Sequence, residues 1–208
     1  VKVNCAALAE GVLLSELFPA VDALGVLEDV RRRGLFRSQV ARLITQGSPF
    51  THLASEASLL TDLGSYALAW KRPDAYRGVW TRFQAGEAML HELEREVFGA
   101  THAEVGAVLL GLWRIPSAVI NAVRWHHDRP AEGASLDART ATALAVLLEH
   151  EILGRTPKAE VDALAAQLQV SSLLPALRSF AARWAPELSR PTTVPSTTST
   201  GGLAHQAA

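Results

Sequence analysis

The segment 96–130 constrains the fold most strongly, because one short break divides it into two helical stretches. Thr101 and Glu104 have the T-x-x-E spacing of a capping box, in which two side chains satisfy free backbone N–H groups at a helix start. The residues that then recur at helical spacing, and that we expect to form one apolar face, are Val105, Val108, Leu109, Leu112 and Trp113. Pro116 ends this stretch and suits the first position of the next helix, because proline has no N–H group to donate.

We predict that the two helices are of equal length, about 12 residues each, and fold back as an antiparallel hairpin. An antiparallel pair brings the start of the first helix beside the end of the second, so His102 should lie near His126 and His127. Three imidazoles at one end of a hairpin form either a metal site or the remnant of one. We also expect Trp113 to face Trp125 across the hairpin and the tryptophans of the chain to lie in the core.

The composition favours an ordinary globular protein. With 208 residues, 49% of them hydrophobic, the chain is long enough to bury the core of one or two domains. A net charge of −1, with both signs mixed along the chain, gives no reason to expect a nucleic acid or an anionic membrane as partner. The single cysteine, Cys5, cannot support a disulfide framework, which favours a reducing cytoplasm. No apolar run is long enough to span a bilayer and no signal peptide is recognisable. The chain opens on Val1, and we expect a longer protein around it.

The remaining periodicity predicts helices throughout and no strand. The predicted helices cover residues 5–18, 22–33, 35–45, 53–70 with a break at Gly64, 76–98 as one long helix, 139–153, 158–168 and 172–184. From residue 189 onward Pro, Thr, Ser and Gly dominate, and such a segment cannot offset its ordering entropy. We therefore predict an all-α helical bundle with a disordered C-terminal tail.

The order of residue types across the hairpin resembles the signature of HDOD domains, the HD-related output domains. That signature has an acidic residue, here Glu96, followed by G-x-x-H-A-x-V-G-A, W-x-x-P and a closing His-His pair. The matching motif residues are Thr101, His102, Glu104, Gly106, Trp113, Pro116, His126 and His127. Upstream, the residues ASLLTDLG at 57–64 resemble the family's A-x-L-L-H-D-I-G segment. The family's opening D-P-x-L and N-S-A motifs are missing, so the chain resembles the later two-thirds of the domain.

The resemblance implies an HD-domain-like all-α fold and a role as a regulatory output module in bacterial signalling, usually without catalysis. It implies signalling proteins as partners, with a receiver domain on the same polypeptide, as in two-component response regulators. We expect a partial HDOD-like domain over 1–150, a C-terminal helical extension over 151–188 and the disordered tail over 189–208.

The residues at the ligand positions of an HD-type metal site indicate whether this chain can catalyse hydrolysis. HD hydrolases use several His and Asp ligands to hold metal ions that activate a water molecule. Here Thr61 replaces the His of the His-Asp pair, no His occurs over 31–37, and no carboxylate occurs over 139–148. Asp62, His102, His126 and His127 remain as the candidate remnant metal or polar site. We therefore expect no cofactor and no catalysis; the alternative is a metal-dependent phosphohydrolase with an incomplete site, acting on a cyclic dinucleotide or nucleotide.

Two groups of charged residues need an interpretation of their own. Asp62 should accept backbone N–H bonds or pair with His126 or His127. The arginines at 31–33, 37 and 42 are interpreted as a solvated helix face, because Glu28 and Asp29 directly precede them. The alternative is that these arginines bind a phosphate-bearing ligand. His52, His91 and His150 show no pattern that predicts a partner.

Overall fold

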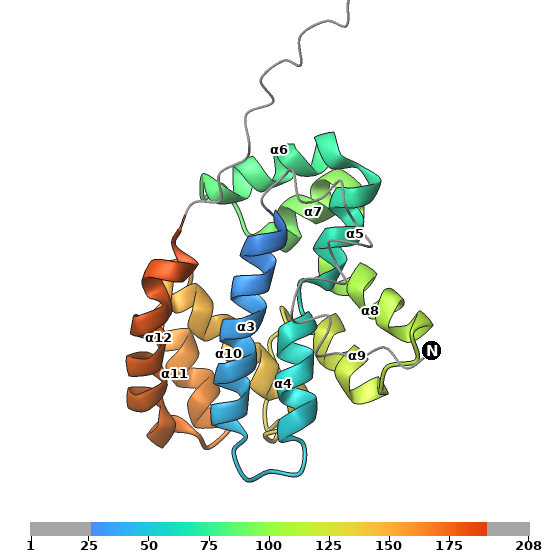
Figure 1. The fold of residues 1–208 in the computed structure, drawn as a ribbon. Helices are drawn as coiled ribbons and strands as arrows, with labels where there is room; N and C mark the ends of the chain where they lie inside the picture. Colours follow the sequence, from blue (N-terminus) through green and yellow to red (C-terminus); the bar gives the residue numbers. More distant parts are fainter. Residues whose placement is uncertain (1–25, 191–208) are drawn as a thin grey trace, which may run out of the picture.

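The computed structural model of the chain describes residues 26–190. These residues form helices and loops with no strand among them, which confirms the all-α prediction (Figure 1). The elements are α3 (Val26–Ile44), α4 (Thr51–Leu60), α5 (Leu63–Lys71), α6 (Pro73–Gln84), α7 (Leu90–Phe98), α8 (His102–Leu112), α9 (Ser117–Arg124), α10 (Ala138–Ile152), α11 (Lys158–Gln167), a short 3₁₀ helix η2 (Ser171–Leu173) and α12 (Leu174–Leu188). The helix predicted over 5–18 and nearly all of the predicted disordered tail lie outside the described residues.

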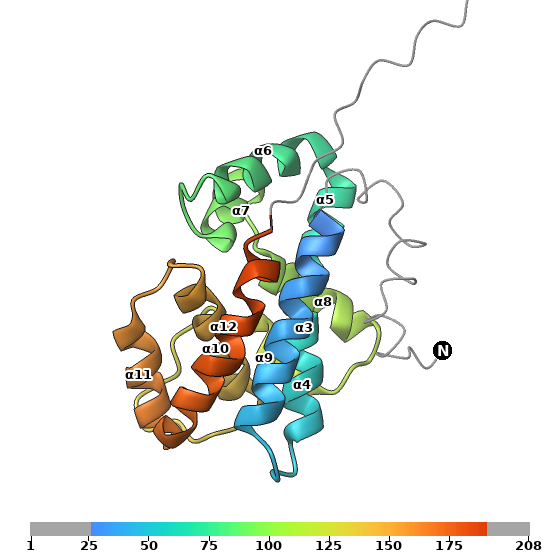
Figure 2. The ribbon, with the colours of Figure 1, turned by 60° about the vertical axis from the view of Figure 1, so that its left-hand side comes forward.

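Three helices form the centre of the molecule. α3, α4 and α10 pack against one another, and α9 lies against both α4 and α10. α5, α6 and α7 form the upper part in Figure 1, and α8 lies below them at the right, against α5 and α9. α11 and α12 flank α10 and α3 on the other side (Figure 2). No helix among residues 26–190 is long and apolar enough to cross a membrane.

Two apolar clusters stabilise these parts. The first joins α5, α6, α7 and α9 through side chains such as Leu63, Trp80 and Leu93. The second joins α3, α10, α11 and α12 and includes Phe36 and Leu144. The helices after residue 151 therefore share an apolar core with α3 and α10.

Three predicted helix boundaries are wrong. Gly34 does not interrupt α3, which runs through it from Val26 to Ile44. Its backbone packs closely on the carbonyl group of Leu59, where a larger residue would not fit. The predicted long helix over 76–98 is two helices, since the chain turns at Gly86 with a positive φ of 74°. The break predicted at Gly64 falls instead at Thr61 and Asp62, and Gly64 lies inside α5.

The predicted apolar face of α8 is also wrong. Val108 and Leu112 are 59% and 73% exposed, and the buried face carries Ala103, Ala107 and Leu110 together with Gly106. The reason is the close crossing of α8 with α5. A methyl group added to Gly64 would lie 2.0 Å from the carbonyl oxygen of His102, so only small side chains fit at this contact. Small residues, not the large ones, therefore mark the buried face.

Two of the tryptophans also contradict the sequence-based prediction. Trp70 is 52% exposed and Trp125 is 39% exposed, whereas Trp80 is buried as expected. Trp125 follows the last residue of α9, so its side chain leaves the apolar face that Val119 and Val123 form. The guanidinium of Arg124 covers its ring at 5.0 Å.

Candidate functional site

The hairpin of α8 and α9 brings the predicted histidines together. Thr101 caps α8, because its hydroxyl oxygen accepts a hydrogen bond from the backbone N–H of Glu104. The carboxylate of Glu104 in turn accepts the backbone N–H of Thr101, which confirms the capping box. Pro116 was predicted as the first helical residue but is the N-cap of α9, so this helix begins one residue later, at Ser117. The two helices are also unequal, at 11 and 8 residues. The antiparallel packing nevertheless places His102 beside the end of α9, as predicted.

The three imidazoles face one another through their Nε2 atoms. The Nε2 atom of His102 lies 2.9 Å from that of His127 and 3.3 Å from that of His126. Asp62, at the start of α5, places its Oδ1 atom 3.4 Å from His102 Nε2 and 3.9 Å from His126 Nε2. The structure therefore assembles all four predicted site residues in one place, three of them fully buried and His127 partly.

Two acceptors orient the imidazoles. Glu94, from α7, lies 2.6 Å from His102 Nδ1 and also accepts the backbone N–H of His102. Tyr76 donates its hydroxyl to the other oxygen of Glu94 at 2.9 Å. The carbonyl oxygen of Val123 lies 2.6 Å from His126 Nδ1. Because carboxylates and carbonyl groups only accept, both Nδ1 atoms carry hydrogen and both Nε2 atoms point into the cluster.

Glu94 is the acidic residue of this site, whereas Glu96, which we matched to the acidic position of the family signature, lies outside it. Glu96 is exposed and pairs with Arg82 on the surface. Glu94 is fully buried and belongs to the apolar face of α7 with Leu90 and Leu93. Its place at helical spacing from two buried leucines is the sequence signal that identifies it.

A guanidinium group is the partner of Asp62. Arg37, which is 2% exposed, donates from one terminal nitrogen to Asp62 Oδ1 at 2.7 Å and to Thr61 Oγ1 at 2.8 Å. Its other nitrogens donate to both carboxylate oxygens of Glu149 on α10. The expected contact of Asp62 with His126 is present at 3.9 Å, but the closest charged partner of Asp62 is Arg37, at 2.7 Å.

The interpretation of the arginine run as a solvated face is wrong for three of its members. Arg32, Arg33 and Arg37 are buried, and Arg31 alone of the run 31–33 pairs at the surface, with Glu28. Asp29 accepts from Arg32 and Arg33, and Arg33 also reaches Glu149 at 3.1 Å. These positions fall on the same helical stripe as Phe36 and Val40, so the arginines follow the apolar face into the interior.

The charges set the protonation of the cluster. Burial alone would raise the pKa of Asp62, but the guanidinium of Arg37 and the neighbouring imidazoles outweigh it and hold that pKa well below its usual range. Burial opposes a proton on His102, yet the negative charges of Glu94 and Asp62 prevail and raise its pKa. Burial, together with the charge of neighbouring imidazoles, lowers the pKa of His126 and His127 well below the ordinary value.

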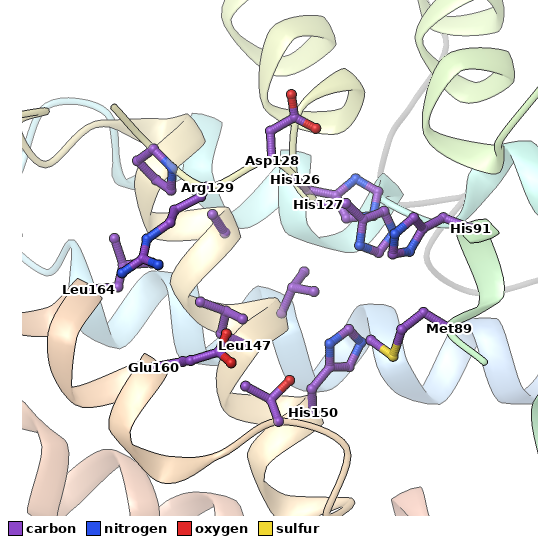
Figure 3. Close-up of a pocket in the computed structure, with 14 residues that line it drawn as sticks. Met89, His91, His126, His127, Asp128, Arg129, Leu147, His150, Glu160 and Leu164 are labelled. Carbon is purple, nitrogen blue, oxygen red and sulfur yellow. The ribbon is translucent and has the colours of Figure 1, made fainter. Parts of the chain in front are cut away.

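A cavity of about 200 Å³ opens beside the cluster (Figure 3). His126 and His127 line it from one side, and His91 and His150 complete a group of four imidazoles. The ring of His91 stacks on that of His127 with centroids 4.1 Å apart, and the ring of His150 lies parallel to that of His127 at 6.3 Å. The sequence gives no sign of this arrangement, because the four residues come from three separate segments.

The positions that correspond to an HD-type metal site do not fit a metal ion here. The segment that carries the single, separate His ligand of an HD-type site contains Arg37 in this chain. The two positions of the His-Asp ligand pair are occupied by Thr61 and Asp62. Arg37 bonds directly to both of these residues and to Glu149, so a fixed guanidinium charge lies among the groups that would surround the ion. A cation bound there would have to displace that charge.

The comparisons with known proteins agree with this fold. A sequence profile of the HDOD domain matches residues 5–129. No protein of curated function matches the chain in sequence. Among solved structures, the chain is similar to an HDOD domain protein of unknown function from Geobacter sulfurreducens, with 18% identity and a TM-score of 0.63. This match covers 81% of the chain and 66% of the other protein.

Two further structures share the fold. The MmoQ response regulator of Methylococcus capsulatus Bath matches with 23% identity and a TM-score of 0.56, covering 72% of this chain and 60% of its own. A protein assigned to signal transduction from Marinobacter aquaeolei VT8 matches with 21% identity and a TM-score of 0.58, covering 76% of this chain and 39% of its own. The chain thus spans at most about two thirds of each of these three proteins. The extent of the profile match and the shared all-α fold lead to one assignment: the chain belongs to the HDOD domain family.

Proposed function

We propose that this chain is a non-catalytic regulatory output module that passes an upstream signal to other signalling proteins through protein–protein contacts. The single observation that carries the proposal is the guanidinium of Arg37 between Asp62 and Glu149. A phosphohydrolase of the HD type needs a metal ion at these positions to activate water. Here the positive charge belongs to the chain itself and has no open coordination position for water or a phosphate.

The contacts of Arg37 support a fixed structural charge rather than a mobile side chain. Its hydrogen bonds reach Thr61, Asp62 and Glu149 from three different nitrogen atoms, and the groups are 4% exposed or less. Bidentate pairing of arginine with a carboxylate is among the stronger and more directional of polar contacts. The site therefore holds α3, the start of α5 and α10 together.

Signalling partners are supported by the proteins that share the fold. Two of the similar structures are a response regulator and a protein assigned to signal transduction. The outer face of α8 carries the exposed side chains of Val108 and Leu112, and we propose this face as part of the contact surface. We propose a receiver domain on the same polypeptide as the source of the input, and the cytoplasm as the compartment.

A hydrolysis assay tests the proposal. The purified full-length protein is incubated with a cyclic dinucleotide and with a p-nitrophenyl phosphodiester, in the presence of Mn²⁺ or Mg²⁺. We expect no turnover above the rate of the metal solution alone. Metal-dependent turnover that the substitution Asp62→Asn abolishes would overturn the proposal and favour the phosphohydrolase alternative.

A matched variant separates a contaminating hydrolase from an intrinsic activity. Glu96→Gln removes a surface carboxylate that pairs with Arg82 and lies outside the site. Activity that survives Asp62→Asn and Glu96→Gln equally comes from another protein in the preparation. Activity lost only with Asp62→Asn belongs to the chain.

A further inference from the structure

We propose that the cavity where α3, α6, α10 and α12 meet binds a small phosphate-bearing molecule through the guanidinium groups of Arg33 and Arg155. The end of α12 lies beside α3 there, with α6 above them (Figure 2). The cavity has a volume of about 350 Å³, within the range of small-molecule sites. The proposal goes beyond the regulatory function and involves neither Asp62 nor the histidine cluster.

Arg155 is a positive charge without a counterion in the described part of the chain. Its side chain is half-buried and forms no ion pair within residues 26–190, and its Nη1 atom is buried with no acceptor. The three buried arginines of α3 are matched by three buried carboxylates that pair with them, those of Asp29, Asp62 and Glu149. The charge of Arg155 is therefore added to a group of buried charges that is already balanced.

The guanidinium group of Arg155 is held in place without any acceptor. Gly154 turns the chain after α10 with a φ of 68°, and the backbone N–H of Arg155 donates to the carbonyl group of His150 at 2.8 Å. The guanidinium carbon lies 4.0 Å from the ring centroid of Phe83, and that of Arg33 lies 4.9 Å from the same centroid. Because the N–H donors of a guanidinium lie at the edge of its plane, contact of its face with a ring leaves them available to an anion.

The two neighbouring guanidinium groups make the cavity favourable for an anion. Burial, and then the charge of Arg33, lower the pKa of Arg155 to about 10, so the group stays charged at neutral pH at a cost that an anion would offset. Arg33 donates from Nε to Asp29 and from Nη1 to Glu149, and within residues 26–190 its Nη2 forms no hydrogen bond. Asp29 also lines the cavity, but it already accepts hydrogen bonds from Arg32 and Arg33.

The chemistry of the cavity favours a phosphoryl group on a small molecule. The planar fork of arginine matches the oxygens of phosphate, and a phosphate ester carries up to two negative charges. Leu153 and Leu188 add apolar surface that a small organic part of the ligand would contact. Arg190 lines the exposed edge, where it pairs only with Glu187 of its own helix and can turn towards the ligand. We therefore expect a phosphate ester or diphosphate of metabolite size.

Isothermal titration of the full-length protein with pyrophosphate, in metal-free buffer of low ionic strength, tests the proposal. We expect one pyrophosphate bound per chain and a higher Tm in its presence, because a ligand that binds only the folded state stabilises it. Inorganic phosphate should bind more weakly at the same site. Malonate serves as a control with two carboxylates, and malonate that binds as tightly as inorganic phosphate would overturn the assignment to phosphoryl groups.

Three variants decide whether this cavity is the site. Arg155→Gln should weaken pyrophosphate binding by about 10–100-fold. Without ligand it should leave the Tm nearly unchanged, because no ion pair among the described residues is lost. Arg155→Lys keeps the charge but not the fork of donors, so its affinity should lie between those of Arg155→Gln and wild type. Arg183→Gln is the matched control, since Arg183 also lies over a phenylalanine ring, that of Phe180, but is exposed and outside the cavity.

Two results would overturn the proposal. The first is the absence of saturable pyrophosphate binding to the wild-type chain, and the second is an equal loss of affinity in Arg155→Gln and Arg183→Gln, which would indicate unspecific attraction by surface charge. Neither result affects the hydrolysis test, because that test depends on added metal ions and on Asp62.

Discussion

Replacing Arg37 by methionine is the substitution that most directly tests the role of its guanidinium group. Methionine keeps much of the side-chain length but removes every hydrogen bond to Thr61, Asp62 and Glu149. The carboxylates of Asp62 and Glu149 are 4% and 0% exposed, so water cannot take the place of the guanidinium. Removing one partner of such a buried ion pair costs about 3–5 kcal/mol.

Urea denaturation followed by far-UV circular dichroism measures this loss, and a thermal scan should show a Tm lower by about 6–20 °C for a chain of this size. Arg31→Met is the matched control on the same helix. Arg31 pairs with Glu28 at the surface, where both side chains are more than a third exposed, so its loss should cost about 0–1 kcal/mol.

A double mutant identifies the cause of the loss. In the Arg37→Met background, Asp62→Asn removes the charge that Arg37 balances, so the two changes together should destabilise less than their sum by about 0.5–3 kcal/mol. A stability of Arg37→Met within about 1 kcal/mol of wild type, well below the cost expected for a buried pair, would refute the reasoning.

Three further predictions concern packing, capping and pH. Gly64→Ala should destabilise the fold by about 1–3 kcal/mol or more, because the added carbon would lie 2.0 Å from the carbonyl oxygen of His102. As a control, Gly78→Ala in the open interior of α6 should be neutral or stabilising by up to about 1 kcal/mol. Equal effects of the two substitutions in urea denaturation would contradict the close crossing of α5 and α8. Thr101→Ala should cost about 0.5–2 kcal/mol in the same assay, and an unchanged midpoint would mean that the capping box contributes nothing. Burial and the charges of Arg37 and Arg33 lower the pKa of His150 in the folded chain. Below about pH 6.5, the unfolded chain therefore binds a proton at His150 that the folded chain does not bind. Because of this difference, His150 lowers folding stability with decreasing pH by up to about 1.4 kcal/mol per pH unit. His150→Gln in chelator-treated protein should therefore lose less stability than wild type between pH 7 and pH 5, and parallel curves would contradict this assignment.

Local patterns predicted the hairpin and the assembly of its histidines correctly. The capping box, the break at Pro116 and the spacing of His102 from the His126-His127 pair depend only on helix geometry, which neighbouring parts of the chain barely alter. The placement of Asp62 beside this cluster rested on the family resemblance, and the structure confirms it.

The buried charges could not be predicted in the same way. A charged side chain on a helix lies at the surface in most proteins, and it enters the interior only where distant segments provide partners. Arg37 meets Asp62 and Glu149 from helices far apart in the sequence, and no local pattern encodes those meetings. In the sequence, Arg37 lies on the same helical stripe as Phe36 and Val40, which indicates burial. We predicted exposure instead, because most charged side chains on helices lie at the surface.

The outer face of α8 shows a second kind of failure. Hydrophobic spacing favoured Val108 and Leu112 as buried residues, because large apolar side chains usually mark the core. The close approach of α5 reverses that order, since only small side chains such as that of Ala103 fit at the crossing beside Gly106. Where two helices cross closely through small residues, the buried face of one helix can therefore be predicted only when the helix that crosses it is known.

The central claim is that a guanidinium group, and not a metal ion, balances Asp62 and Glu149. A crystal structure of the chain grown with Mn²⁺, with anomalous diffraction measured at a wavelength sensitive to manganese, tests it most directly. We predict density of the Arg37 side chain between the two carboxylates and no anomalous peak there. An anomalous peak within bonding distance of Asp62 and Glu149, with Arg37 turned away from them, would contradict it.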